Sequence, residues 1–324
     1  MQKQPLSNKI SSDNRSWLMV IVGLFIIGFI SIILVGIIGL FLSFPSSDMG
    51  ITGKGNIAVI AVDGPIVTTD GKPFSGAVAV SSDVVKLIEK AKKEASIKGV
   101  LFSINSPGGS AVASDEISNA IKELRDANKT SAAMIRDMGT SGAYWIAVST
   151  DHIIAHPASF TGSIGVISSY VEFADLFEKY GLTYQRLVAG DMKDIGSPYK
   201  HMAPGEEAVF QQSLDELHDV FIKHIADSRG MQFGDVKNLA TGVFYTGTKA
   251  KDLGLVDELG SRKEAENYFK NRLNVNITFV DYKKPRGFFE TLAEGLSEQS
   301  FSVGQGIGYA LRDSSVVDEI SVRV

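Results

Sequence analysis

The most apolar part of the chain is one uninterrupted run near its start. Residues 17–44 read WLMVIVGLFIIGFISIILVGIIGLFLSF and contain no ionisable side chain. As a helix this run would span about 42 Å, more than the roughly 30 Å hydrocarbon core of a bilayer. It is about twice as long as the apolar region of a cleaved signal peptide, and the following FPSS lacks a small-residue cleavage site. The run therefore predicts an uncleaved transmembrane helix.

Charges on either side of this run predict its orientation. Three basic residues and one acid precede it, whereas Lys54 is the single basic residue in the fifteen positions that follow. The positive-inside bias keeps residues 1–16 in the cytoplasm. The rest of the chain, joined by a linker at 45–55, is expected to lie outside the cytoplasmic membrane, which the protein crosses once.

Beyond the linker, short β-branched runs alternate with segments whose apolar residues have helical spacing. Strands are expected at 56–67, 99–105, 131–135, 153–156, 164–168, 184–188 and 277–282, and helices at 81–98, 110–127, 141–148, 174–180, 204–228 and 263–269. This alternation indicates an α/β fold with a largely parallel sheet over residues 56–282. The tail at 283–324, with an amphipathic piece at 288–296 and a Gly-rich piece at 304–308, is expected to make an assembly contact or a membrane-surface contact.

Composition excludes several kinds of chemistry. The 324 residues include no Cys, so disulfides, zinc–thiolate sites, iron–sulfur clusters and a thiol nucleophile are ruled out. The formal net charge of −5 argues against a nucleic-acid partner, whose phosphates need clustered Lys and Arg.

Two Gly-containing turns follow predicted strands and open predicted helices. The first, NSPGG at 105–109, would leave backbone N–H groups free to face an anion or a developing oxyanion, or it is a plain Pro-Gly turn. The second, GTSGAY at 139–144, exposes Ser141 at the start of a short apolar helix, as a nucleophilic hydroxyl requires. The alternative for Ser141 is an ordinary helix N-cap, and the Gly-x-Ser-x-Gly pattern is absent because Gly142 follows it directly.

A serine nucleophile needs a base, and none of the five histidines stands in a setting typical of one. Lys193, in a Gly-led turn after an apolar run, is the alternative base. A lysine serves as a base only where desolvation disfavours its ammonium form, so a solvated Lys193 paired with Asp194 or Asp191 is the competing interpretation. In a third turn, TGSIGV at 161–166, the Ser163 hydroxyl could orient a neutral amine or simply bond to backbone groups.

The ordered set of motifs resembles the bacterial signal peptide peptidases of the SppA type, membrane proteases with a Ser/Lys dyad. The strings that carry the resemblance are NSPGG, TSGAYW, TGSIGV, GDMKDIGSP and GVFYTGTKAKDLGLVDELG, and the match covers about residues 56–259. Thr140 and Ala143 stand where relatives often have Ala and Gly. The tail after Lys283 matches no pattern of the family.

The resemblance implies a role for five residues. Ser141 would be the nucleophile and Lys193 the general base, with the Ser163 hydroxyl positioning the lysine. The backbone amides of Gly109 and Gly142 would form the oxyanion hole. Neither a metal nor another cofactor is implied.

The resemblance also implies a fold, an assembly and a substrate. The fold would be the Clp protease/crotonase-like spiral of ββα units, forming a peptidase domain at 56–282 behind one N-terminal transmembrane helix. Short family members assemble as homo-oligomeric rings in which serine and lysine meet across a subunit boundary. The substrates would be remnant signal peptides and other apolar peptides at the outer face of the cytoplasmic membrane, which residues 17–44 would span.

Two other classes of protein fit parts of the pattern. A crotonase-like acyl-CoA enzyme also uses NSPGG-type oxyanion turns, but it would bind coenzyme A and tolerate loss of Ser141. A catalytically silent membrane scaffold would use the ring for assembly alone. Labelling of Ser141 by an active-site-directed serine reagent would exclude the scaffold.

Overall fold

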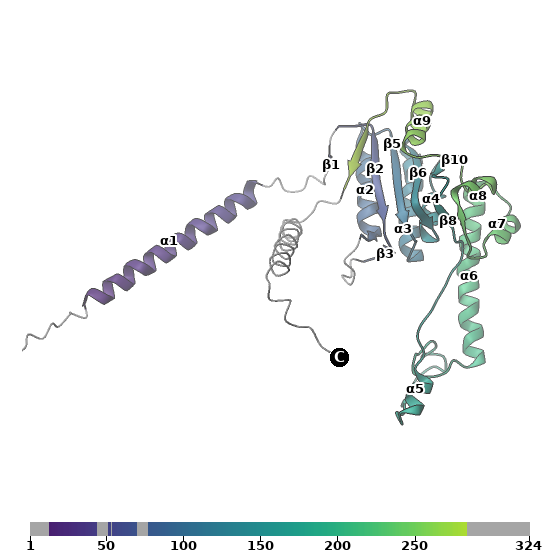
Figure 1. The fold of residues 1–324 in the computed structure, drawn as a ribbon, viewed down its shortest axis with the longest axis horizontal. Helices are drawn as coiled ribbons and strands as arrows, with labels where there is room; N and C mark the ends of the chain where they lie inside the picture. Colours follow the sequence, from purple (N-terminus) through teal and green to yellow (C-terminus); the bar gives the residue numbers. More distant parts are fainter. Residues whose placement is uncertain (1–12, 44–50, 53, 70–76, 284–324) are drawn as a thin grey trace, which may run out of the picture. The chain divides into compact units, whose positions relative to one another are not determined.

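The computed structural model describes residues 13–43, 51–52, 54–69 and 77–283 (Figure 1). The chain divides into two compact units, Met1–Asp48 and Met49–Val324, which are considered separately. The described residues of the first unit form the helix α1 (Asp13–Ser43), whose side chains are described at residue 17 and at 21–36. Over the described stretch no helix is long and apolar enough to cross a membrane. The tail pieces predicted at 288–296 and 304–308 lie outside the described residues.

The second unit is built on a mostly parallel sheet with the strand order β1-β11-β2-β5-β6-β7-β10. Antiparallel pairing occurs only at two places in the described sheet, between β1 and β11 and between β8 and β9. The strands are β1 (Ile51–Thr52), β2 (Ile57–Asp63), β5 (Gly99–Ser106), β6 (Thr130–Thr140), β7 (Ile153–Ala155), β8 (Phe160–Gly162), β9 (Phe244–Thr246), β10 (Glu258–Leu259) and β11 (Phe279–Tyr282), with a separate pair β3 (Ile66–Val67) and β4 (Ala79–Val80).

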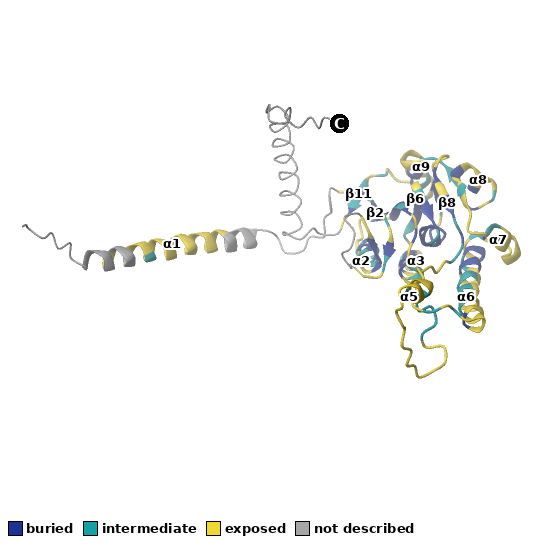
Figure 2. Cartoon of the chain, turned by 60° about the horizontal axis from the view of Figure 1, so that its bottom comes forward, coloured by how far each residue is buried: buried dark blue, intermediate teal, exposed yellow. Residues whose placement is uncertain are grey.

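Helices cover the two faces of this sheet unequally. They are α2 (Ser81–Lys93), α3 (Ala111–Asp126), α4 (Gly142–Ala147), α5 (Ala174–Lys179), α6 (Pro204–Arg229), α7 (Phe233–Leu239), α8 (Gly247–Asp252) and α9 (Arg262–Leu273). Along β2, Ala58 and Ile60 join a large core with α2, α3, α4 and α6, whereas the alternate residues Ile57 and Val59 join a small core under α9. Figure 2 shows the buried residues concentrated between the helices and the sheet. The α/β class predicted from the alternating pattern is confirmed.

Two of the predicted strands are wrong. Residues 164–168 and 184–188 form no strand, and the strand of that region is β8, which ends at Gly162. Ile167 is 90% exposed and Leu187 98% exposed, because both segments leave the sheet and have no neighbouring strand within the described chain. Apolar and β-branched composition favours a strand only where a partner strand and a core are at hand.

The segment that leaves the sheet, residues 166–203, is called the arm. It contains α5 and a run of turns at 191–196, and it is largely exposed. Figure 1 shows the arm at the N-terminal end of the long helix α6, away from the sheet. The arm is therefore connected to the body of the unit chiefly through α6.

An ion pair fastens the other end of α6 to the sheet. Arg229 donates from Nη1 and Nη2 to the two carboxylate oxygens of Asp257, at 2.9 and 2.7 Å. Asp257 Oδ2 also accepts the amide of Ile153 on β7 at 2.8 Å. Burial alone would raise the pKa of the Asp257 carboxyl, but Arg229 outweighs it and holds that pKa below its usual value. The carboxylate therefore stabilises the fold only while it is ionised.

We expect Asp257→Asn to lower the free energy of unfolding by about 2–4 kcal/mol, because Arg229 is left partly buried without a countercharge. This loss of unfolding free energy should be complete above about pH 4. It should shrink as the pH falls through the lowered pKa of the native Asp257 carboxyl, because the wild-type carboxylate then becomes protonated and the ion pair is lost in the wild type as well. Chemical denaturation at a series of pH values measures both the loss of unfolding free energy and its dependence on pH. Arg125→Gln, which breaks the more exposed Arg125–Asp151 pair, is the matched control and should change stability by less than about 1 kcal/mol. Equal losses in the two variants would contradict the assignment.

Candidate active site

The residue predicted as nucleophile stands at a sharp strand-to-helix turn. β6 ends at Thr140, α4 begins at Gly142, and Ser141 between them has φ 53° and ψ −124°. A positive φ at a non-Gly residue costs on the order of 1–3 kcal/mol and persists only where surrounding structure enforces it. This is the geometry of a nucleophile elbow, although the Gly-x-Ser-x-Gly sequence pattern is absent. The strained backbone is a signal that the sequence did not carry.

Backbone hydrogen bonds on both sides hold Ser141 in this conformation. Its amide donates to the carbonyl of Gly162 at 2.8 Å, continuing the parallel pairing of Thr140 with Gly162 between β6 and β8. Its carbonyl accepts the amide of Trp145 at 3.0 Å in the first turn of α4. Every residue of α4 is buried, so the helix cannot rotate to relieve the strain. Ser141 itself remains half-exposed.

The Gly-rich turn after β5 lies directly against the Ser141 turn. A Cβ on Gly108, whose φ is +95°, would stand 2.7 Å from the amide nitrogen of Gly142 and 2.9 Å from the Cβ of Ser141. A Cβ on Gly109, whose φ is +154°, would stand 2.1 Å from the carbonyl oxygen of Ile66. Only glycine allows the two turns to approach this closely.

Two unused backbone donors meet at this junction. Neither the amide of Gly109 nor that of Gly142 donates a hydrogen bond to another group in the described part of the chain. They are neighbours, because a Cβ on Gly142 would lie 3.3 Å from the Gly109 nitrogen. Adjacent free N–H groups beside a hydroxyl are what a developing oxyanion requires.

Asn105 and Ser106 were not predicted as functional, yet both shape the site. Between β5 and β6 the register shifts after Ile104, and the Asn105 side chain fills the gap. Its Oδ1 accepts the Met138 amide at 3.2 Å, and its Nδ2 donates to Asp137 at 3.3 Å. Ser106 Oγ accepts the amide of Gly108 at 3.1 Å. Polar side chains at the end of a buried strand were the available sequence signal.

Ser163 lies next to the Ser141 turn. It directly follows Gly162, the residue that accepts the Ser141 amide, and its own φ is 50°. Its hydroxyl donates to the carbonyl of Gly242 at 3.2 Å, and its amide donates to Val243 at 2.9 Å. The structure therefore brings Gly109, Ser141, Gly142 and Ser163 together.

Lys193 is not brought to this group within one chain. It is exposed in the turns of the arm, where its amide donates to Gly190 at 3.0 Å. None of the contacts described within the chain joins Lys193 to Ser141 or Ser163, and Figure 1 shows the arm well away from β6 and α4. A single copy of the chain thus presents the nucleophile and the lysine separately.

One histidine, which is partly buried, does contact a serine hydroxyl, but the serine is buried. His224 Nε2 lies 3.2 Å from Ser149 Oγ and 3.1 Å from the carbonyl of Trp145, on which the imidazole stacks. Burial lowers the pKa of His224 and favours its neutral form. Ser149 is 5% exposed and bonds to buried Ser118, so this cluster supports α4 rather than meeting a substrate.

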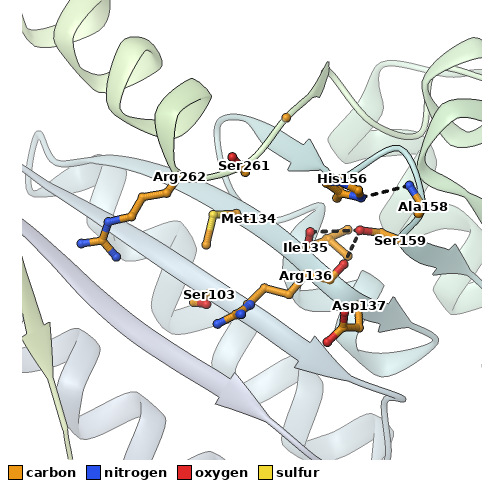
Figure 3. A pocket seen from close by; sticks show the side chains of 11 residues that line it. Ser103, Met134, Ile135, Arg136, Asp137, His156, Ala158, Ser159, Ser261 and Arg262 are labelled. Atoms are coloured by element: carbon orange, nitrogen blue, oxygen red, sulfur yellow. Dashed lines mark hydrogen bonds between the residues drawn. The ribbon is translucent and has the colours of Figure 1, made fainter.

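A separate cavity of about 540 Å³ lies where β5, β6 and β7 meet the start of α9 (Figure 3). Its lining includes Arg136, Asp137, His156, Ser159 and Arg262, and none of the four clustered site residues. Ser159 Oγ donates to the carbonyls of Ile135 and Arg136, while His156 Nδ1 accepts the amide of Ala158 at 3.2 Å. The Ser159 hydroxyl and His156 Nδ1 are thus both engaged with backbone groups.

The fold and the clustered residues define an α/β protein with a strained serine facing two free amides. Comparison with known proteins identifies the class. Residues 123–276 match the model of peptidase family S49. The putative protease MJ0651 of Methanocaldococcus jannaschii is 33% identical over 231 residues, which cover 70% of this chain and 72% of that protein.

Two further relatives agree with this match. The putative signal peptide peptidase SppA of Enterococcus faecium is 31% identical over 229 residues, 70% of this chain and 67% of that protein. The chloroplastic serine protease SPPA of Arabidopsis thaliana is 27% identical over 284 residues, 85% of this chain but 42% of the relative. The chain belongs to peptidase family S49 and is a peptidase of the SppA type, as the ordered motifs predicted.

We expect Gly108→Ala to lower peptidase activity by about a hundredfold or more, because the added Cβ would displace the amide of Gly142 from its place beside Ser141. Hydrolysis of a quenched fluorescent peptide measures the effect. Gly205→Ala is the control: it lies in α6 with nothing within 4 Å of the added Cβ and should leave activity unchanged. Equal activity of the two variants would place the reaction elsewhere.

Proposed function

We propose that the chain is a serine endopeptidase with a Ser/Lys dyad, in which Ser141 is the nucleophile and Lys193 of a neighbouring copy is the general base. The strained Ser141 turn, with two free amides beside it, is the observation that carries the proposal. Ser163 would orient the lysine amine, and the amides of Gly109 and Gly142 would hold the oxyanion. The family match to a protease supports this assignment of chemistry.

In the proposed mechanism, the neutral amine of Lys193 removes the hydroxyl proton of Ser141 as Oγ attacks the peptide carbonyl. The two amides bind the tetrahedral oxyanion, each typically contributing about 3–4 kcal/mol. The resulting ammonium then protonates the leaving amine, and an acyl-enzyme remains. The amine next accepts a proton from the water that attacks the acyl carbon. The ammonium returns this proton to Ser141 Oγ as the acyl–oxygen bond breaks and the second product leaves.

A second copy of the chain would supply what one copy lacks. A solvated lysine stays charged at neutral pH, so Lys193 needs a partner surface that removes water from its amine. The arm exposes apolar side chains that such a partner would cover, including Val171 at 68%, together with Ile167 and Leu187. A homo-oligomeric ring, with each arm laid on the next copy, meets both requirements.

The remaining proposals concern domain division, fold lineage and location. The repeated strand–helix units from β2 to β7 favour a Clp protease/crotonase-like spiral for residues 56–282.

Residues 17–44 would anchor the chain in the cytoplasmic membrane, with residues 1–16 inside and the peptidase domain outside. An apolar run without charge, and a described stretch of α1 whose apolar side chains are exposed, support the anchor. Remnant signal peptides and other apolar peptides released at that surface would be the substrates.

We expect Ser141→Ala and Lys193→Ala each to abolish cleavage of the fluorescent peptide while the fold, measured by thermal unfolding, is retained. Mixing the two inactive proteins under conditions that exchange subunits should restore activity. About a quarter of the sites would draw an intact serine and an intact lysine from different copies. A serine-directed phosphonate should label wild type at Ser141 and leave Ser141→Ala unlabelled.

Three results would contradict this prediction. Retained cleavage by either single variant would remove the dyad. Failure of the mixture to regain activity, with exchange verified, would place both residues of a site in one chain. Absence of labelling together with coenzyme A binding would favour an acyl-CoA enzyme, and absence of both would favour a silent scaffold.

We expect the full-length chain to sediment with membranes and to resist extraction by high salt, because about 0.8 kcal/mol is gained for each methylene buried in lipid. A variant that starts at residue 49 should remain in the supernatant. Introducing Lys at Ile27 and Ile30, near the middle of the apolar run, should weaken membrane association in the full-length chain. Salt extraction of the wild type, or membrane retention of the shortened chain, would contradict the proposed anchor.

A further inference from the structure

Asp194, which follows Lys193 in the sequence, has a carboxylate that is already bound by other side chains. Arg186 donates from Nε to Asp194 Oδ2 at 2.6 Å and from Nη2 to Oδ1 at 2.9 Å, a bidentate pair. Lys200 Nζ adds a third contact, 3.5 Å from Oδ1. The Asp194 side chain is only 12% exposed although the arm around it is open. Asp194 therefore pairs with Arg186 and Lys200 and not with Lys193.

The same guanidinium closes the turn that carries Lys193. Arg186 Nη2 donates to the carbonyl of Asp191 at 2.8 Å, so Arg186 holds the residues on both sides of the lysine. Lys200 continues the network by donating to Glu206 at 2.5 Å. Glu206 Oε2 accepts the Ala203 amide at 3.1 Å at the start of α6. The turn is thereby attached to the helix that joins the arm to the body.

Several charged groups of the arm are committed to partners other than Lys193. Hydrogen bonds from Arg186 lower the pKa of the Asp194 carboxyl to about 2, so this group remains an anion committed to its partners. Glu172, just before α5, and Asp175, within α5, both contact His201. Asp191 is exposed, and its contact with Arg186 is through its carbonyl. Lys193 has no ion-pair partner among the residues that the structure describes.

We propose that Arg186, assisted by Lys200, is a positioning residue that withholds Asp194 from Lys193. A carboxylate at the lysine would stabilise the ammonium form and remove the base from the reaction. By binding Asp194, Arg186 leaves the amine free to lose its proton when a second copy covers it. This inference rests on the proposed Ser/Lys dyad and adds to it the residues that keep the lysine usable.

The pH dependence of kcat/KM tests the proposal, because its acidic limb reports the base of the free enzyme. The full-length protein in detergent and a quenched fluorescent peptide are used. Arg186→Gln should raise the midpoint pH of the acidic limb by about one pH unit or more, because Asp194 can then pair with Lys193 and stabilise its ammonium form. Asp194→Asn should not move it upward, and the double variant should return it to the wild-type position.

Controls separate this effect from a loss of structure. Arg125→Gln removes an arginine from a comparable arginine–aspartate pair in the body, at 2.9 Å, and should leave the limb unmoved. If Arg186→Gln does not fold, Lys200→Gln keeps the bidentate pair and should give a smaller shift in the same direction. A drop in activity that is uniform across pH, in whichever of these two variants is measured, overturns the proposal.

The reference variant Lys193→Ala separates failure of the proposed Ser/Lys dyad from failure of the proposed role of Arg186. If it is inactive while the Arg186→Gln limb stays in place, the dyad stands and the role of Arg186 falls. If Lys193→Ala keeps wild-type activity, the dyad and the role of Arg186 fall together. An upward shift that the double variant does not reverse also overturns the proposal, because Asp194 would then not be its cause.

Discussion

The pairing of β6 with β8 is the constraint on which the site depends. After the register shift at Ile104, which the Asn105 side chain fills, β6 still pairs with β5 through Gly139 and Ser106. On its other edge, β6 pairs first with β7 and then with β8. The bond from the Ser141 amide to Gly162 then fixes the last residue before α4. Because α4 is buried throughout, the chain must turn within one residue, and that residue takes the strained conformation. The strain at Ser141 is thus a consequence of sheet topology.

Two parts of the second unit are stabilised by different forces. The body is held by burial of apolar side chains on both faces of its sheet, with 0% exposure at Ile60 on one face and at Ile57 on the other. The arm buries little apolar surface and is held by ion pairs around Asp194 and His201. Such pairs fix local geometry at small net gain in free energy, so they can shape a turn without creating a core. The nucleophile lies in the first part and the proposed base in the second.

Sequence patterns predicted what depends on neighbours along the chain and missed what depends on neighbours in space. The buried strand at 99–105 and the helix at 110–127 were predicted correctly because apolar spacing alone determines them. The segments at 164–168 and 184–188 have the composition of strands, but no strand of the described residues lies beside them. The positive φ of Ser141 and the capture of Asp194 by Arg186, eight residues away, depend on packing and on charge partners that spacing cannot identify.

Comparison of Ser149–His224 with the proposed Ser141–Lys193 pair shows why proximity alone does not make a catalytic pair. Ser149 and His224 touch, but the Ser149 side chain is buried and both groups bond to the carbonyl of Trp145 in α4. Ser141 has an open side and free amides beside it, yet its proposed base, Lys193, stands in solvent on another part of the chain. An amine base must be desolvated before it can act, and the surface able to do this belongs to a second copy. In the proposed mechanism, assembly therefore converts Lys193 from a solvated cation into a base, which would confine proteolysis to the assembled form.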